Sequence, residues 1–224
     1  FTDGLRYEFA ENSANDLADC VKNMYFDDFV KYQAEYLSKC WDHSDIRIVG
    51  CKKNQAEIRY MLYQLLQNTG TDKYSNVSAK GLSGEGYEGH YFWDTEIYIL
   101  PLLQMVQPET ARKLLEYRYN ILPSAIIRAR ELGHDKGATY PWRTISGIES
   151  SGYFPAGTAQ YHINADIAYA FIQHFLFNQD YNFLVEMGAE VIYQTARIWL
   201  EIGNYSNGQF MINSVTGPDE YTAL

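Results

Sequence analysis

Apolar residues recur along most of the chain at the three- and four-residue spacing that is typical of amphipathic helices. Pro108 stands just before one such stretch, where proline favours the first helical turn, and Asp180 is placed to cap another helix. The pattern predicts an all-α, layered helical domain. The stretches that carry this prediction are residues 17–25, 58–66, 111–122, 163–176 and 187–202.

Residues 94–106 form a different kind of stretch, because apolar residues cover every side of the expected helix. A helix that is apolar all round is normally buried all round. We therefore expect an inner helix with amphipathic neighbours around it. The segments 69–93, 133–162 and 203–224 are rich in glycine, aromatic and polar residues, and we expect loops there.

The composition narrows the class of protein. The 224 residues are 46% hydrophobic and 21% charged, which fits one large folded domain or two small ones and excludes intrinsic disorder. No apolar run reaches the roughly 20 residues that a membrane span needs. The net charge of -10 disfavours nucleic acid and acidic membrane surfaces as partners.

The cysteine and histidine residues give no sign of disulfides or of a metal site. Cys20, Cys40 and Cys51 are odd in number and form no Cys-x-x-Cys pair, and the histidines show no ligand spacing. A reducing compartment fits best, so we expect a cytoplasmic protein. The chain opens on Phe1 and stops soon after a Gly-Pro-Asp-Glu turn, which favours a piece of a longer protein.

Residues 84–89 read GEGYEG and match the Gly-x-Gly-x-x-Gly pattern of dinucleotide-binding sites. That fingerprint needs a buried strand before it and a helix that starts within it. The preceding residues 78–83 are polar, so we interpret the glycines as a flexible loop. No Gly-x-Ser-x-Gly elbow is present, so nucleophilic acyl chemistry has no support.

Three clusters place aromatic residues beside carboxylates at junctions of loops and helices. This mixture suits sugars, because aromatic faces stack on C–H surfaces and charged groups bind hydroxyls. Aromatic residues make up 16% of the chain and many belong to a core, so an unassigned helical domain stays the alternative to carbohydrate binding. The clusters are residues 91–96, 139–143 and 216–221.

Glu220 has the strongest case for catalysis. It follows a Gly-Pro turn in a loop, and Asp219 and Tyr221 favour a raised carboxyl pKa through like charge and partial burial. A carboxylic acid with a raised pKa is the proton donor that a glycosidic leaving oxygen needs. The alternative is a helix cap or a surface carboxylate. For His162, at the start of an expected helix, a substrate contact and a capping role are equally open.

Four separate motifs occur in order along the chain: YEGHYFWDTE at 87–96, GATYPWR at 137–143, HINADIAYA at 162–170 and GPDEY at 217–221. Together they resemble glycoside hydrolase family 65, which holds inverting disaccharide phosphorylases that act on maltose, trehalose, kojibiose and nigerose. Several motifs in the same order are far more specific than any one alone. The resemblance runs from about Asp16 to the end of the chain.

The resemblance implies an (α/α)6 barrel, built of an inner and an outer ring of helices. Residues 1–44 would be a helical linker that follows a β-sandwich domain, and residues 45–224 would be the first half of the catalytic barrel. A half barrel leaves inner faces uncovered, so we expect this piece alone to be poorly stable. We expect the intact protein to be a homodimer.

The family's residue roles carry over motif by motif. Glu220 matches the general acid that protonates the glycosidic oxygen. Trp93 and Asp94 match the pair that holds the non-reducing glucose, and Trp142 and Arg143 lie in the loop beside that pocket.

His162 and Tyr153 complete the expected set of substrate-binding residues. Tyr153 lies in the loop 149–160, which reads ESSGYFPAGTAQ and corresponds to the loop that shapes the acceptor subsite. Maltose and trehalose phosphorylases of the family carry a His-Asn-Glu run there, so the departure favours a kojibiose- or nigerose-like substrate over maltose. Thr222 is a second departure, because many members have histidine at that place.

The implied reaction is phosphorolysis without a cofactor. An inverting phosphorylase needs only the acid, because inorganic phosphate is the co-substrate that attacks C1 and yields β-glucose 1-phosphate. The phosphate-binding residues, or the base of a hydrolase, come from the second half of the barrel in this family. A trehalase-like hydrolase that uses water, a non-catalytic carbohydrate-binding domain and a helical interaction scaffold therefore stay as alternatives.

Overall fold

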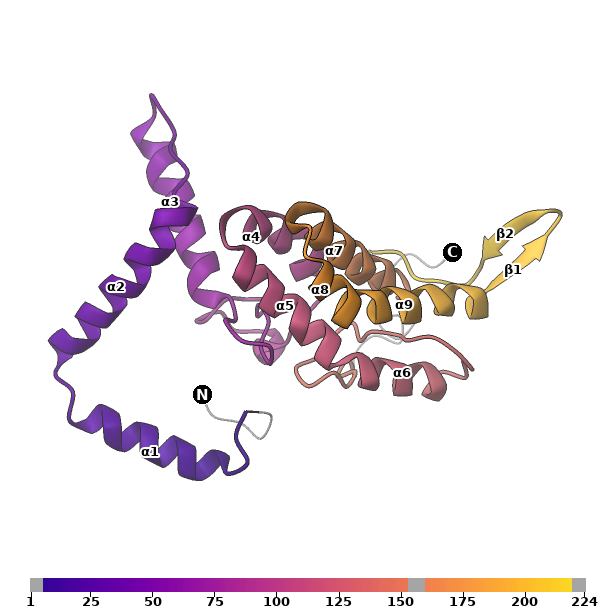
Figure 1. Cartoon of the computed structure of the whole chain (residues 1–224), viewed down its shortest axis with the longest axis horizontal. Coiled ribbons are helices and arrows are strands. Elements are labelled where there is room, and N and C mark those ends of the chain that lie inside the picture. The colour runs from indigo at the N-terminus through magenta and orange to yellow at the C-terminus, as the bar shows by residue number, and fades with distance from the viewer. Residues whose placement is uncertain (1–5, 153–159, 219–224) are drawn as a thin grey trace. The chain divides into compact units, whose positions relative to one another are not determined.

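The computed structural model describes residues 6–152 and 160–218, and their regular structure is helical apart from one short hairpin (Figure 1). The predicted all-α class is confirmed. The chain divides into two compact units, residues 1–66 and 67–224, and each is described by itself. The expected domain boundary at residue 44 stays a prediction. Within the described ranges, no helix is both long and apolar enough to cross a membrane.

The first unit contains α1 (Ala10–Lys22), α2 (Phe26–Ser44) and most of α3 (Lys52–Asn68). The apolar stripe over residues 17–25 predicted one continuous helix there, and this is wrong, because α1 ends at Lys22. The carboxylate of Asp28 accepts a hydrogen bond from the backbone N–H of Tyr25 at 2.9 Å. This bond and the acidic first turn begin a new helix just where the hydrophobic period would continue the old one.

The second unit packs its helices around α7 (His162–Asn178). Helix α7 contacts α4 (Leu100–Val106), α5 (Pro108–Asn120) and α9 (Ala189–Ile202). Its side chains Ile163, Ile167 and Phe171 are fully buried. The stretches predicted over 111–122, 163–176 and 187–202 therefore supply the helical core. The remaining elements are α6 (Leu122–Glu131), α8 (Tyr181–Phe183), the π-turn η4 (Leu184–Gly188) and the 3-10 turn η1 (Tyr87–Gly89).

The segment predicted to be buried on all sides starts with the π-turn η2 (Thr95–Ile99) and continues as α4. Leu100 and Leu103 are fully buried, but Tyr98 is 68% exposed and Met105 is 64% exposed. The prediction of burial all round is therefore wrong. Helices α5 and α7 contact α4, and the described residues cover only that side of it.

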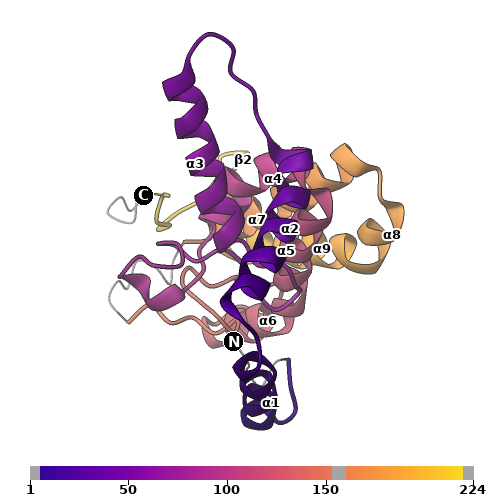
Figure 2. The same cartoon turned by 90° about the vertical axis from the view of Figure 1, so that its left-hand side faces the viewer.

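The loops of this unit gather on one side of its helices, where Figure 2 shows the segments 69–93 and 133–152 together. The expected loop 203–224 begins instead with a hairpin, β1 (Gly203–Ser206) and β2 (Gln209–Ile212), in which Gly203 pairs with Ile212. The sequence carried a signal for this hairpin, because Asn-Gly at 207–208 favours the tight turn between two strands.

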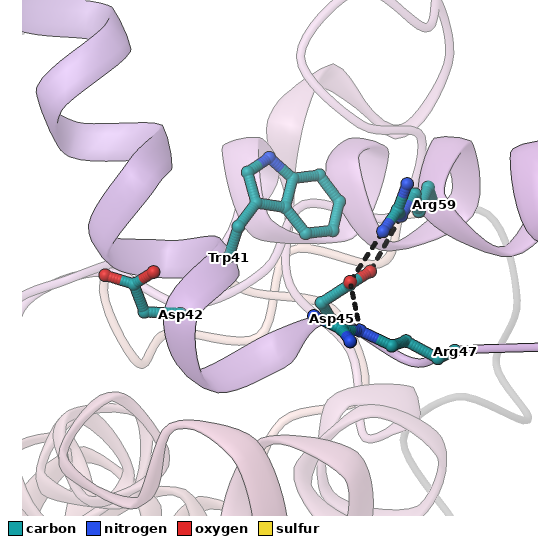
Figure 3. A pocket seen from close by; sticks show the side chains of 5 residues that line it. All are labelled: Trp41, Asp42, Asp45, Arg47 and Arg59. Carbon is teal, nitrogen blue, oxygen red and sulfur yellow. Dashed lines mark hydrogen bonds and ion pairs between the residues drawn. The ribbon is translucent and has the colours of Figure 1, made fainter.

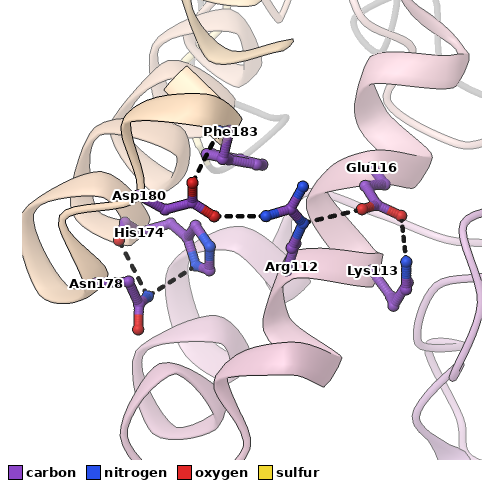
Figure 4. Close-up of polar contacts among 7 residues, drawn as sticks. All are labelled: Arg112, Lys113, Glu116, His174, Asn178, Asp180 and Phe183. Carbon is purple, nitrogen blue, oxygen red and sulfur yellow. Dashed lines mark hydrogen bonds and ion pairs between the residues drawn. The ribbon is translucent and has the colours of Figure 1, made fainter. Parts of the chain in front are cut away.

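Asp180 caps α8 as predicted, and it also connects neighbouring helices (Figure 4). One oxygen of its carboxylate accepts a hydrogen bond from the backbone N–H of Phe183 at 3.0 Å. The other oxygen forms an ion pair with Arg112 of α5, which also reaches Glu116 at 3.1 Å. Asp180 therefore connects the segment between α7 and α8 to α5.

Candidate functional site

Two of the three aromatic clusters are joined by backbone hydrogen bonds. The N–H of Tyr91 donates to the carbonyl of Thr144 at 2.8 Å, and the N–H of Thr144 donates back at 3.2 Å. This isolated bridge places the loop that carries Trp93 and Asp94 beside the loop that carries Trp142. Residues about 50 positions apart in the sequence thus form one wall.

A buried ion pair lies behind the first loop. Nε of Arg118 is 2.7 Å from Oε1 of Glu96, and a terminal nitrogen of Arg118 is 2.8 Å from Oε2. The same nitrogen donates to the carbonyl of Phe92 at 3.0 Å. Arg118 is fully buried and Glu96 is 1% exposed. Burial opposes the charge of Arg118, but Glu96 outweighs it, and the pKa of Arg118 is raised. The pair therefore fixes the backbone immediately before Trp93.

Tyr140 holds the second loop, which carries Trp142, through two hydrogen bonds. Its backbone N–H donates to Oδ1 of Asn164 at 2.9 Å, and its hydroxyl donates to the carbonyl of Arg118 at 3.0 Å. Burial raises the pKa of Tyr140 far above the ordinary value for tyrosine, so the hydroxyl keeps its proton and remains a donor. The loop is thereby held at a point two residues before Trp142.

These loops border a pocket of about 380 Å³, within the range of roughly 300–1,000 Å³ that is usual for small-molecule sites. Five of its nine lining residues are aromatic, and one carboxylate and one ammonium group also line it. Trp93, Asp94 and Trp142, which the sequence analysis expected at a sugar site, all line it. The complete lining is Ala79, Lys80, Tyr87, Phe92, Trp93, Asp94, Tyr98, Trp142 and Pro218.

Trp142 is 8% exposed and packs edge-on against Phe92, with ring centroids 5.0 Å apart. The carboxylate of Glu149 supports this loop by accepting hydrogen bonds from the backbone N–H groups of Trp142 at 2.6 Å and Arg143 at 3.3 Å. The guanidinium of Arg143 forms an ion pair with Glu88. Arg143 therefore lies beside the pocket with its charge already balanced, and its substrate-binding role stays a prediction.

His162 is the first residue of α7, and its side chain makes two contacts that a cap would not need. Nδ1 lies 2.6 Å from Oδ2 of Asp166, one turn further along the helix. The ring packs edge-on against Trp93, with centroids 5.0 Å apart and planes at 85°. No side-chain capping bond is formed at the start of α7. His162 thus supports Trp93 from behind, while a direct substrate contact stays a prediction.

Two expected site residues, Glu220 and Tyr153, lie outside the described residues. Pro218 lines the pocket, and Glu220 follows it two positions later in the sequence. Within 6–152 and 160–218, no group of three His, Cys, Asp or Glu residues is placed to hold a metal ion.

Two kinds of residue around the pocket were not expected from the sequence. Tyr87 lines the pocket from the glycine-rich segment 84–89, and Lys80 lines it from the polar residues just before that segment. Glu96 and Arg118 support the pocket without lining it. A signal existed for Glu96, because it is a carboxylate inside an otherwise apolar helix. No local pattern marks Arg118, which lies 22 residues away.

A larger pocket of about 560 Å³ lies within the first unit (Figure 3). Arg59 holds the carboxylate of Asp45 through two bonds of 2.7 and 2.6 Å, and Arg47 lies 3.7 Å from it. Trp41 and Asp42 complete its walls. The hydrogen bond from Arg59 is the main reason why the pKa of Asp45 is lowered. This pocket holds none of the residues that the motifs single out.

Comparison of the chain with protein-family models gives a match over most of its length. Residues 59–224 match the model of the glycosyl hydrolase family 65 central catalytic domain. The chain belongs to glycosyl hydrolase family 65. The resemblance drawn from four short motifs is confirmed, and the pocket lies within the part that matches the family 65 model.

Family 65 relatives include an α,α-trehalose phosphorylase of Geobacillus stearothermophilus, 53% identical over 225 residues. That alignment covers 100% of this chain and 29% of the relative. A kojibiose phosphorylase of Halothermothrix orenii is 42% identical over 201 residues, which cover 82% of this chain and 26% of the relative. A solved structure provisionally assigned as a kojibiose phosphorylase from the human microbiome has a TM-score of 0.83 at 32% identity, covering 96% of this chain and 28% of that one. The chain thus spans less than a third of the length of these relatives.

Proposed function

We propose that the protein containing this chain cleaves an α-linked glucose disaccharide with inorganic phosphate and inverts the configuration at C1. The observation that carries the proposal is the pocket lined by Trp93, Asp94 and Trp142 in a family 65 chain. The named relatives are disaccharide phosphorylases. The substrates are the disaccharide and inorganic phosphate, without a cofactor.

In the proposed complex, Trp93 and Asp94 hold the non-reducing glucose. The half-buried indole offers a rigid face for the C–H surface of the sugar, because His162 packs behind it. The exposed carboxylate of Asp94 accepts hydrogen bonds from sugar hydroxyls. Trp142 lines the same pocket, Arg143 contributes from the same loop as Trp142, and Tyr153 contributes from the loop 149–160.

Glu220 is the proposed general acid. It gives its proton to the glycosidic oxygen while a phosphate oxygen attacks C1 from the opposite face. The bond between C1 and the glycosidic oxygen breaks, and the products are β-glucose 1-phosphate and a free sugar. Its position two residues after the pocket-lining Pro218 supports this role.

We propose α,α-trehalose as the first substrate to test. Two trehalose phosphorylases are 53% and 50% identical to the chain, and the kojibiose phosphorylases are 37–42% identical. The loop 149–160 favoured a kojibiose- or nigerose-like substrate instead. The two orders of preference make different predictions, so one substrate panel distinguishes them.

The test uses the natural full-length protein with trehalose, kojibiose, nigerose and maltose, each with and without inorganic phosphate. We expect β-glucose 1-phosphate only when phosphate is present, with trehalose giving the highest kcat/KM. A higher value for kojibiose or nigerose would restore the preference drawn from the loop. Equal release of glucose without phosphate would identify a hydrolase, and no turnover with measurable sugar binding would identify a non-catalytic binder.

A further inference from the structure

The glycine-rich segment 84–89 has an unusual backbone. Gly86, Tyr87, Glu88 and Gly89 have φ values of +99°, +55°, +43° and +75°, so four consecutive residues lie in the left-handed region. Two of them are not glycine, and such residues cost about 1–3 kcal/mol each unless the surroundings hold them. Strain of this kind gathers at ligand sites. The segment is therefore a candidate part of a ligand site.

The segment closes tightly on Lys80. A Cβ atom at Gly84 would lie 2.0 Å from the carbonyl oxygen of Lys80 and 2.7 Å from its Cβ, so only glycine fits there. Past this contact, the left-handed turn brings Tyr87 back over the lysine. The ammonium nitrogen of Lys80 lies 5.6 Å from the centroid of the Tyr87 ring. The loop thus holds Lys80 by its backbone and by its side chain.

Tyr87 is itself fixed from two further sides. Its ring packs edge-on against Phe92 with centroids 5.0 Å apart, and the guanidinium carbon of Arg143 lies 5.8 Å from its centroid. Glu88 forms the ion pair with Arg143. These contacts tie the glycine-rich loop to both aromatic loops of the pocket and supply the restraint that its strained backbone requires.

Lys80 and Tyr87 both line the pocket that holds Trp93 and Asp94. The charge of Arg143 is balanced by Glu88, whereas Lys80 has no carboxylate partner among the described residues. An ammonium group offers three hydrogen-bond donors and no acceptor. The pocket therefore combines a carboxylate that accepts from hydroxyls with a cation that donates to them, between aromatic walls.

We propose that Lys80, held in place by the glycine-rich loop and Tyr87, donates hydrogen bonds to hydroxyl groups of the disaccharide and determines how tightly it binds. The inference rests on the proposed function, whose sugar pocket it extends. A sugar fits better here than phosphate because five of the nine lining residues are aromatic and because Asp94, which also lines the pocket, repels an anion.

The test replaces Lys80 by methionine in the natural full-length protein. The matched control is Lys73→Met, because the Lys73 ammonium also lies over a tyrosine ring, 5.3 Å from the centroid of Tyr74, but does not line the pocket. We expect Lys80→Met to raise the KM for the disaccharide about tenfold or more, since a hydrogen bond to a charged group is lost. The kcat and the KM for phosphate should stay within about twofold, and Lys73→Met should change nothing.

Lys80→Arg keeps a positive charge and hydrogen-bond donors that can lie over Tyr87, so we expect it to retain more affinity for the disaccharide than Lys80→Met does. An unchanged disaccharide KM in Lys80→Met would overturn the inference, and so would a rise confined to the KM for phosphate. A fall in kcat with a lower unfolding temperature would identify a structural lysine and overturn it as well. If the wild-type protein forms no β-glucose 1-phosphate, the proposed function fails and this inference fails with it. Wild-type turnover with an unchanged KM in the variant rejects the inference alone.

Discussion

The pocket around Trp93 and the pocket around Trp41 both combine indole, carboxylate and cationic side chains. In the first, an arginine–carboxylate pair is buried behind the wall, and Lys80, which lines the pocket, has no carboxylate partner among the described residues. In the second, Asp45 lies in the wall and its carboxylate is paired with Arg59 through two hydrogen bonds (Figure 3). The difference separates groups that support a pocket from groups that can meet a ligand.

The largest effect is expected from the proposed acid. Glu220→Gln removes the proton that the leaving oxygen needs, so kcat should fall by about a thousandfold or more. Asp42→Asn, which changes a carboxylate in the other pocket, should leave kcat unchanged. Phosphate-dependent turnover of the natural full-length protein measures both. Near-normal turnover of Glu220→Gln would remove the assignment.

The second prediction compares the two arginine–carboxylate pairs. Arg118→Met leaves Glu96 buried and unpaired, and we expect a loss of about 3–5 kcal/mol in the free energy of unfolding. Arg59→Met breaks a pair of similar geometry in an exposed setting, and its effect should fall within the error of the measurement. Chemical denaturation followed by circular dichroism gives both values. Equal losses would show that burial does not distinguish the pairs.

A double variant at Glu96 and Arg118 extends this test. Replacing both Glu96 and Arg118 by apolar residues of similar volume removes the unpaired charge, so stability should recover in part. Catalysis should not recover with it, because the carbonyl of Phe92 would lose its donor and Trp93 its fixed position. Full recovery of turnover in the double variant would contradict the positioning role of the pair.

The third prediction separates two glycines of the same loop. Gly84→Ala forces the segment away from the carbonyl of Lys80, so the KM for the disaccharide should rise about tenfold, as for the loss of the lysine. Gly81→Ala meets no atom within 4 Å and is strained only by its φ of +73°. It should cost about 1 kcal/mol of stability and leave the KM unchanged. Indistinguishable KM values for the two variants would count against the close contact at Gly84.

The smallest effect is expected from His174, which lies near Arg112 and Asp180 in the second unit (Figure 4). Burial, and after it Arg112, lowers the pKa of His174, while Asp180 and Glu109 act in the opposite direction. The unfolded chain therefore binds a proton at a pH where the folded chain does not. The contribution of His174 to the free energy of unfolding is fully present above a pH of about 6.5. It is lost as the pH falls below that value toward the lowered pKa of the folded chain.

His174→Asn should flatten this acid limb of the stability profile. Denaturation midpoints measured between pH 7 and pH 5 report the slope. An unchanged slope in His174→Asn would mean that other groups carry the acid sensitivity.

Local periodicity was sufficient for the helical core. The stripes at 163–176 and 187–202 depend only on spacing within one helix, and α7 and α9 follow them. The break between α1 and α2 was missed because Asp28 starts a helix inside an unbroken apolar pattern. The exposure of Tyr98 and Met105 depends on which neighbours cover α4, and spacing carries no information on that.

The candidate site was predictable where motifs mark it. Trp93, Asp94 and Trp142 were expected together and do line one pocket. Lys80 was missed because its position depends on a left-handed path through residues 86–89, which propensity does not reveal. Arg118 was missed because its partner Glu96 lies on another element, so their meeting is a property of the tertiary fold.

The backbone bridge between Tyr91 and Thr144 bears on how the loops around the pocket can be exchanged between relatives. If the loop 139–152 is replaced by the loop of a relative, the residue at the place of Thr144 can shift. The segment around Tyr91 would then shift with it, because two backbone hydrogen bonds join the two. The backbone thus couples the two loops, and we expect successful chimaeras to exchange 80–94 and 139–152 together. Single-loop chimaeras should misalign the indole of Trp93 even when every transplanted side chain is compatible.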